Sequence, residues 1–309
     1  MYNWGRLRPA PFLFMKLANF SAVLLALVCS LALLGQWPEF PGSNADPAGP
    51  APKAADGKPD FSGLWSSGGG GAKGKDKGKG EKGKGDKGPP PDGAPGGAKG
   101  KGKGGPPPIA GGIPPGGFLN MGQNFPDGLL PYTEAGLALR RARLARNSAD
   151  HPDAHCLPLN PIQLWLHPQP RKLIQTSGVT LMIAEANDGL RQLFTDGRPL
   201  PNAADVLPWW FGYSTAKWDG DTMVVESTGF LEDSWADEQG SPLSNQARVT
   251  ERIRRPNYGT LEVEITVNDP KFYTRPWTVT ATQRLLPNEE LIEFVCAENN
   301  TSLKHLVAK

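Results

Sequence analysis

The chain has 309 residues, enough for two domains, but its 38 glycines and 32 prolines are concentrated in a few segments, and the rest amounts to one domain. The formal net charge is +2. The sequence contains no dinucleotide-binding or phosphate-binding glycine motif, no metal-ligand spacing and no nucleophile motif. It therefore excludes the enzyme classes that such motifs define, and it predicts no cofactor and no metal site.

The N-terminal segment, residues 1–45, has the composition of an export signal. Basic residues precede an apolar run at 17–35, and the small-x-small sequence SNA at 43–45 is a candidate cleavage site. We therefore expect a protein exported to the periplasm or the extracellular space of a bacterium. An uncleaved membrane anchor is the alternative, because the apolar run is near the minimum length of a spanning helix. The start at Met1 or Met15 stays open, and residues 46–59 are expected to be a linker.

A first strand at residues 60–67 is followed by a tract, residues 68–117, made almost entirely of lysine, glycine and proline. Between Lys73 and Lys103, ten lysines and four acidic residues give a net charge of +6, which leaves −4 for the rest of the chain. Such a composition buries too little surface to fold, so we expect a disordered insertion. It is either a solvated spacer or an attachment to an anionic envelope surface. Specific nucleic-acid binding is not expected, because no aromatic residue interrupts the lysines to stack on bases.

Residues 118–299 are expected to contain the rest of the domain. Thr133 is the expected N-cap of a short helix, and a proline-rich extended connector follows at 152–170. Short strands then succeed one another, joined by turn sequences such as Asp219-Gly220 that supply positive φ angles. The expected strands lie at about 173–176, 179–185, 190–195, 211–218, 221–227, 248–254, 260–267, 277–285 and 290–297.

With the strand at 60–67, about ten strands are expected, and the fold class is all-β. Closure removes exposed sheet edges, so we expect an antiparallel up-and-down barrel of the lipocalin kind, with a sandwich as the alternative. Residues 300–309 are expected to be a tail. Removal of an export signal leaves Cys156 and Cys296, which an oxidising compartment favours as a disulfide; the alternative is two buried thiols.

Five motifs are similar to those of an uncharacterised family of exported bacterial proteins: DFSGLW at 60–65, DGRP at 196–199, WDGDTMVVE at 218–226, RVTER at 248–252 and DPKFYTRPW at 269–277. The resemblance covers most of residues 60–299 and implies secretion and a β-rich fold, with no established activity. Members of this family often carry histidine where this chain has Leu200 and Leu243, which argues against histidine-dependent chemistry. The sequence GLW at 63–65 also resembles the first strand of lipocalin and related calycin barrels.

Arg191, Asp196 and Arg198 form the first candidate site. A guanidinium beside a carboxylate suits an acidic ligand, and the alternative is that the sequence Asp-Gly-Arg-Pro is an ordinary turn.

Glu251 is the main candidate for catalysis. Strand alternation puts Glu251 on the apolar face of 248–254, and puts Arg252 and Arg254 on the opposite face. An inward carboxylate among apolar neighbours has a raised pKa and can transfer protons, with Tyr273 as a second weak candidate. The alternative is an internal ion pair with an arginine such as Arg248 or Arg284.

Aromatic residues form the third candidate. Trp218, Tyr273 and Trp277 are expected to wall a ligand cavity, with Arg252 or Arg254 orienting a polar end of the ligand.

The leading hypothesis is therefore an exported barrel that binds a small, partly apolar molecule without catalysis. The alternatives are a lyase, isomerase or hydrolase that uses buried carboxylates, and an envelope-surface structural module attached through its basic tract. Fold alone does not separate these functions. The orientation of Glu251 does discriminate, since an inward carboxylate without an arginine favours the enzyme.

Overall fold

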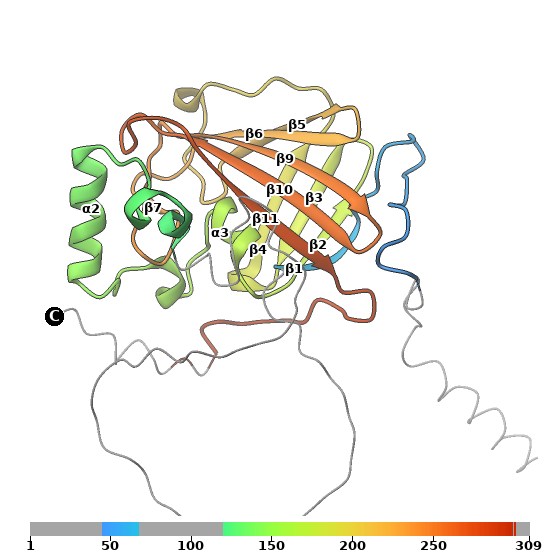
Figure 1. Cartoon of the computed structure of the whole chain (residues 1–309), viewed down its shortest axis with the longest axis horizontal. Coiled ribbons are helices and arrows are strands. Elements are labelled where there is room, and N and C mark those ends of the chain that lie inside the picture. The colour runs from blue at the N-terminus through green and yellow to red at the C-terminus, as the bar shows by residue number, and fades with distance from the viewer. Residues whose placement is uncertain (1–44, 68–119, 299, 301–309) are drawn as a thin grey trace, which may run out of the picture. The chain divides into compact units, whose positions relative to one another are not determined.

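The strands of this protein close into a barrel. The computed structural model describes residues 45–67, 120–298 and 300, with the backbone alone of Asn124 and Asp188. Within these ranges nine strands follow one another in the order β1-β11-β10-β9-β6-β5-β4-β3-β2, and β2 pairs again with β1 (Figure 1). Their bounds are Gly63–Ser67 (β1), Arg171–Gln175 (β2), Val179–Ala184 (β3), Gly189–Phe194 (β4), Tyr213–Asp219 (β5), Thr222–Thr228 (β6), Arg248–Asn257 (β9), Thr260–Asn268 (β10) and Trp277–Leu285 (β11).

The long strands alternate buried side chains with side chains that point outward. In β9 the buried residues Val249, Glu251 and Ile253 alternate with residues that point outward, and β10 and β11 follow the same period of two. The expected turn between β5 and β6 is present, with Gly220 at φ 59°. The all-β barrel is therefore confirmed, and the sandwich alternative is wrong.

Two expectations about the strands are wrong. β4 and β5 pair in parallel, over only Leu193↔Ser214 and Phe194↔Thr215, so the barrel is not antiparallel throughout. Parallel neighbours cannot be joined by a hairpin, and residues 195–212 form the longer connection that they require. Residues 290–297, expected to be a tenth strand, join no ladder, because Cys296 is tied to a segment outside the barrel strands.

Helix α2 (Glu134–Ala145) begins where the sequence predicts. Thr133 Oγ1 accepts a hydrogen bond of 3.1 Å from the backbone N–H of Gly136, as an N-cap does. Gly136 also allows close packing, since a Cβ at this position would overlap the backbone carbonyl oxygen of Phe272. The helix lies beside a small two-stranded sheet made by β7 (Ser234–Trp235) and β8 (Pro242–Leu243) (Figure 1).

The connector at 152–170 is not extended, as the sequence analysis expected, but partly helical. It contains a 3-10 turn, Pro152–His155, and a short helix, α3 (Pro161–Leu166). The side-chain oxygen of Asn160 caps α3 by accepting hydrogen bonds from the two N–H groups of Ile162 and Gln163, and a proline occupies the first helical position. Every residue of α3 is buried, so this helix contributes to the core.

The core fills the barrel with large apolar side chains from every strand. Trp65, Trp165 and Trp277 are among its largest fully buried members. The other buried apolar residues of the strands include Leu173, Met182, Leu193, Ala216, Met223, Val225, Ile253, Leu261, Val263, Ile265, Val279 and Ala281. Their burial is the main stabilising contribution to the fold.

The expected disulfide between Cys156 and Cys296 is present, with 5.4 Å between the two Cα atoms, which is compatible with an exported protein. None of the helices in the described ranges has the length and apolar character needed to cross a membrane. Nearly all of the export segment, the whole lysine-rich tract and nearly all of the tail lie outside the described residues.

Candidate functional site

A buried ion pair lies inside the barrel. Arg191 on β4 and Glu251 on β9 have almost no exposed surface. One guanidinium nitrogen of Arg191 donates to Glu251 Oε1 at 2.8 Å, and the other donates to Oε2. The indole N–H of Trp165 donates to Oε1 as well. Glu251 therefore faces inward, as alternation predicts, but its partner is neither Arg248 nor Arg284.

Hydroxyl groups complete this cluster. Arg191 Nη2 also donates to Ser227 Oγ at 2.9 Å and to Ser214 Oγ at 3.2 Å, and the two hydroxyls lie 2.8 Å apart. Both carboxylate oxygens of Glu251 are thus engaged by donors. A carboxylate held by two guanidinium nitrogens is poorly suited to accept a proton from a substrate, because protonation would leave a buried arginine unpaired. The arrangement lacks the arginine-free carboxylate that would favour an enzyme.

A second arginine, Arg171 on β2, is fully buried and has no carboxylate partner in the part of the chain that the structure describes. Its guanidinium instead donates to the carbonyl oxygens of Trp165, His167 and Gln169 and to the side chain of Gln283. Burial lowers the pKa of Arg171 to about 9. This residue ties the end of α3 and the segment after it to β11. Both of its terminal guanidinium nitrogens already donate to acceptors of this chain, and among the described residues only its buried Nε is without an acceptor.

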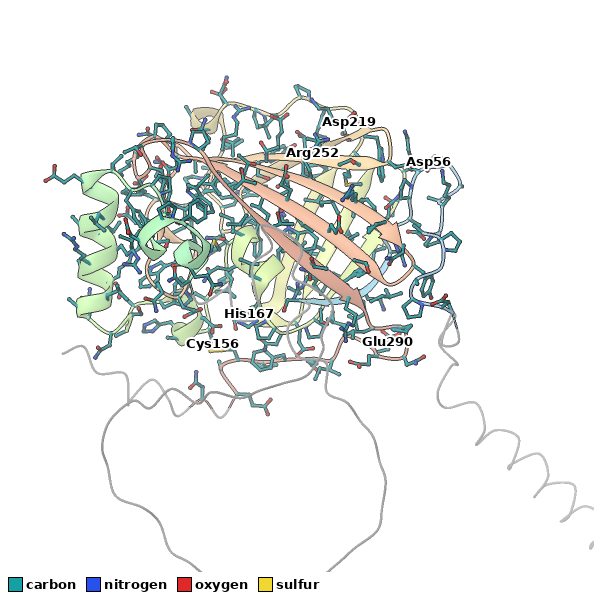
Figure 2. The ribbon with its side chains drawn as sticks, in the orientation of Figure 1. Asp56, Cys156, His167, Asp219, Arg252 and Glu290 are labelled. Carbon is teal, nitrogen blue, oxygen red and sulfur yellow. A yellow bond between two sulfur atoms is a disulfide. The ribbon has the colours of Figure 1, made fainter. Side chains whose placement is uncertain are left out.

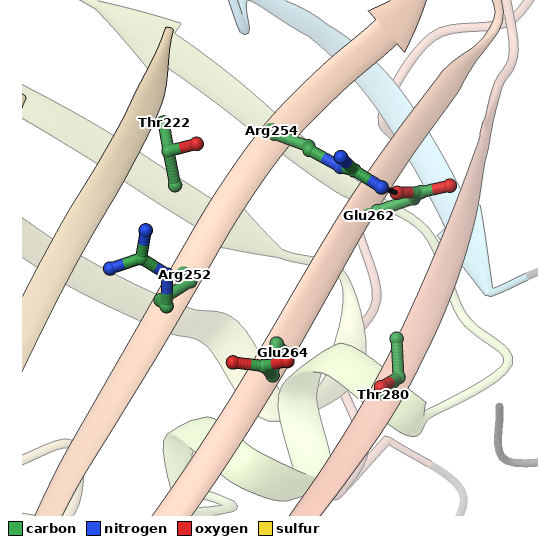
Figure 3. Close-up of a pocket in the computed structure, with 6 residues that line it drawn as sticks. All are labelled: Thr222, Arg252, Arg254, Glu262, Glu264 and Thr280. Carbon is green, nitrogen blue, oxygen red and sulfur yellow. Dashed lines mark hydrogen bonds and ion pairs between the residues drawn. The ribbon is translucent and has the colours of Figure 1, made fainter. Parts of the chain in front are cut away.

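A shallow polar groove crosses the outer face of the barrel (Figure 3). It is about 370 Å³ in volume and is lined by Thr222, Arg252, Arg254, Glu262, Glu264 and Thr280. Arg252 pairs with Asp219 at 2.9 Å (both labelled in Figure 2), and Arg254 pairs with Glu262 at 2.6 Å. These cations are outward, as predicted, but each already has a carboxylate. Exposed pairs of this kind contribute little to stability and leave little charge for a ligand.

A larger pocket, about 620 Å³, lies where the segment after Ala45 packs against the β9–β10 turn. The backbone N–H of Gly259 donates to the carbonyl of Pro47, and that of Tyr258 donates to the carbonyl of Gly49, both at 2.8 Å. The walls combine apolar and polar side chains: Ala45, Pro47, Tyr258, Thr260, Thr282, Arg284, Leu285 and Pro287. Arg284 has no ion-pair partner among the described residues. We refer to this site as the turn pocket.

The three aromatic residues expected to wall one cavity do not lie together. Trp277 pairs with Val267 at one end of β10, next to Tyr273, whose ring centroid is 5.4 Å away. Trp218 lies at the other end of the barrel, where its ring centroid is 5.3 Å from that of Phe61. Both Tyr273 and Trp277 are buried in the core, and Tyr273 donates its hydroxyl to a backbone carbonyl. Trp218 therefore cannot share a cavity with Tyr273 and Trp277, because they lie at opposite ends of the barrel.

Arg198 belongs to a turn, as the alternative interpretation predicted. Its Nε lies 2.9 Å from both carboxylate oxygens of Asp196, and Gly197 has φ 84°. This pairing lowers the pKa of Asp196. Arg198 also donates to the hydroxyl of Tyr213 at 3.0 Å and lies over the ring of Phe194. It does not meet Arg191, which is inside the barrel.

An acid and a base of unusual pKa meet outside the barrel. His151 Nε2 lies 3.4 Å from Glu238 Oε1, and His151 Nδ1 accepts a hydrogen bond from the backbone of Asp153. Burial lowers the pKa of His151 to about 4, and burial raises the pKa of Glu238 to about 7. Between these pH values both groups are neutral, so the contact is not an ion pair. The hydrogen bond of His151 Nε2 is to the side-chain amide nitrogen of Gln163, at 2.9 Å.

The two shifts act on stability in opposite directions. Glu238 binds its proton more tightly in the folded protein, so its contribution is present below pH 4.5 and is lost as the pH rises to about 7. His151 binds its proton less tightly in the folded protein, so its contribution is present above pH 6.5 and is lost as the pH falls to about 4. The two contributions offset each other in the range where both titrate.

The turn pocket was not predicted from the sequence. Its signal was weak: Tyr258 and Gly259 resemble an ordinary hairpin turn, and the sequence suggests Arg284 only as an internal partner of Glu251. Contact with Pro47, more than 200 positions earlier in the sequence, carries no local pattern. Within the described ranges, no group of three His, Cys, Asp or Glu side chains is placed to hold a metal ion.

Compared with known proteins, the chain matches no family model, no curated protein and no solved structure. The resemblances drawn from its motifs therefore stay predictions.

Proposed function

We propose that this protein binds a small, partly apolar molecule in the turn pocket, without catalysis, after export from the cell. The observation that carries the proposal is the pocket itself, about 620 Å³, which is lined by Tyr258, Leu285 and Pro47 together with Arg284. Ligand sites are typically concave and mainly apolar, with a few polar groups that orient the ligand. An apolar wall with one guanidinium suits a molecule that ends in a carboxylate or another anion.

The backbone around the turn pocket is already ordered for binding. Arg255 donates to the carbonyl oxygen of Tyr258 through Nε at 3.1 Å, and its guanidinium lies 5.4 Å from the centroid of the Tyr258 ring. Leu285 donates its backbone N–H to the carbonyl of Gly259 at 2.9 Å. Walls that are fixed before the ligand arrives reduce the entropy lost on binding. The absence of catalysis rests on the engagement of Glu251 by Arg191.

The test uses dansyl-labelled undecanoic acid, a fluorescent probe with an apolar chain and a carboxylate. Saturable binding to the full chain is expected. Arg284→Ala should weaken binding by roughly tenfold to a hundredfold, because a hydrogen bond to a charged group contributes about 1.5–3 kcal/mol. Arg284→Lys should weaken it less, since the charge is kept.

Arg248→Ala is the matched control. Arg248 is an exposed arginine on β9, 3.7 Å from Glu226, and it does not line the turn pocket. Its loss should leave probe affinity unchanged. If the probe does not saturate, or if Arg248→Ala and Arg284→Ala weaken binding equally, the turn pocket is not the ligand site.

A further inference from the structure

The outer surface of the barrel has two unlike halves. On β6, β9, β10 and β11 the outward side chains are almost all polar: Thr222, Val224, Glu226, Thr250, Arg252, Arg254, Glu262, Glu264, Thr266, Thr278, Thr280 and Thr282. On β2, β3 and β4 six of the outward side chains are apolar: Ile174, Val179, Leu181, Ile183, Leu190 and Phe194. We call these six residues the apolar outer face.

Strand pairing makes the apolar outer face continuous. Leu181 lies directly opposite Ile174, and Ile183 lies directly opposite Leu190. Side chains that face each other across two strands are close enough to touch. Leu190 is 54% exposed and Ile174 is 36% exposed, on the two outer strands of the face, and Val179, Leu181 and Ile183 on the central strand β3 are half-buried. A contiguous exposed apolar patch of this kind marks an interaction site.

The sequence of these strands supports the same conclusion. β3 reads VTLMIA, with Met182 and Ala184 buried inside and Leu181 and Ile183 outside. Near-continuous apolar runs are typical of strands that are covered on both faces, whereas a strand with one wet face alternates. β10 reads TLEVEITVN and alternates clearly. β3, the central strand of the apolar outer face, therefore has the composition of a strand that another surface covers.

The charges at the margins of the apolar outer face indicate the kind of partner. Lys172 is paired with Glu290 at 2.9 Å on one side, and Arg198 is paired with Asp196 on the other. Because both cations are neutralised by this chain's own carboxylates, the face has little to attract an anionic lipid headgroup or an acidic peptide. An uncharged apolar surface is complementary to an identical surface, as a twofold-symmetric contact requires. We propose that the apolar outer face is the contact between two copies of this chain.

The size of the face sets the expected strength. Three strands about 4.8 Å apart and six residues long, at about 3.3 Å per residue, present a footprint of roughly 300 Å². A stable dimer buries about 800 Å² per partner, so the contact belongs to the weak, reversible class. The turn pocket is not part of this face, and failure of the proposed ligand site would leave the dimer proposal untouched.

Sedimentation equilibrium of the full chain over about a hundredfold range of concentration tests the proposal, since a weak dimer is populated only by mass action. The wild-type protein should shift from monomer to dimer within that range. Leu190→Glu should weaken the dimer at least tenfold, because two carboxylates would be placed in an apolar contact. Ile174→Glu should act in the same direction. Both positions are exposed, so the variants should keep the circular dichroism and the melting temperature of the wild type.

Thr278→Glu is the matched control, because it adds the same charge at an exposed position of β11 on the polar half of the barrel. It should dimerise like the wild type, and the comparison isolates the apolar outer face from association through any other part of the chain. A wild type that stays monomeric throughout overturns the proposal, and so does a Leu190→Glu variant that dimerises with unchanged affinity. A monomer that binds phosphatidylcholine vesicles, and loses this binding in Leu190→Glu, would identify lipid as the partner and overturn it as well.

Discussion

The buried ion pair between Arg191 and Glu251 makes the sharpest prediction of the structure. We consider Arg191→Met, Glu251→Leu and the double variant, which replace the charges by apolar groups of similar volume. Each single change leaves one charge buried without its partner, and such a change costs about 3–5 kcal/mol. Either single variant should therefore lose a large part of the free energy of unfolding.

The double variant should be more stable than either single variant. The hydroxyls of Ser214 and Ser227 still bond to each other at 2.8 Å once the arginine is gone. The indole N–H of Trp165 loses its acceptor, which costs about 1–3 kcal/mol when the group is buried. The double variant should therefore lose about 1–3 kcal/mol, and the coupling energy between the two sites should be roughly 3 kcal/mol or more.

Equilibrium urea unfolding followed by tryptophan fluorescence and by circular dichroism measures these free energies, with the disulfide left intact. Coincident transitions by the two probes are the condition for comparing the variants. Additive losses in the double variant, or a loss below about 1 kcal/mol in both single variants, would show that the two side chains do not act as a pair.

Three further results are expected. Reduction of the disulfide should lower the free energy of unfolding by about 5 kcal/mol in the chain-entropy model, because it closes a loop of 140 residues; chemical unfolding with and without reductant measures this, and no change would refute it. Gly136→Ala should lower the melting temperature, although alanine normally favours a helix, because its Cβ would overlap the carbonyl of Phe272; an unchanged or higher melting temperature would contradict the packing. The stability of Glu238→Gln should fall as the pH drops from 6.5 towards 4, because only the shift of His151 is left, and the stability of His151→Gln should rise as the pH drops from 7 to 4.5, because only the shift of Glu238 is left. Thermal unfolding across this pH range measures both, and the same slope in both variants would refute the assignment.

Local patterns predicted much of the fold. The turn at Gly220, the N-cap at Thr133 and the inward orientation of Glu251 each depend on residues close together in the sequence, and each is present. The partner of Glu251 depends on how four strands, β4, β5, β6 and β9, are arranged in the barrel. Local sequence therefore could not identify it. The alternation of side chains does exclude Arg248 as this partner, because Arg248 is three positions from Glu251 and must point to the opposite face of the strand.

Other features have no local signal at all. Parallel pairing of β4 and β5 is decided by the course of residues 195–212, which read as an ordinary loop. The extended connector was predicted from its prolines, whereas Asn160 followed by Pro161 is a recognisable helix start that the composition obscured. The turn pocket requires contact between segments more than 200 residues apart.

The residues that the sequence marked as a ligand site take part in closing the barrel. β4 and β5 share two residue pairs, whereas β5 and β6 share seven, so the backbone ladder is shortest at the β4–β5 junction. Inside the barrel, Arg191 on β4 crosses this junction to reach Ser214 and Glu251.

Outside the barrel, side chains cross the same junction. Arg198 follows β4 and donates to the hydroxyl of Tyr213 on β5, and the rings of Phe194 and Tyr213 stack at 5.3 Å. A junction with few backbone hydrogen bonds must be held by side chains on both of its faces, since an open junction would expose two strand edges. The clustering of arginine, carboxylate and aromatic side chains that resembles a binding site is therefore explained by the need to fasten parallel strands. The site for a ligand is better sought where such a group has no ion-pair partner among the described residues, as is the case for Arg284 in the turn pocket.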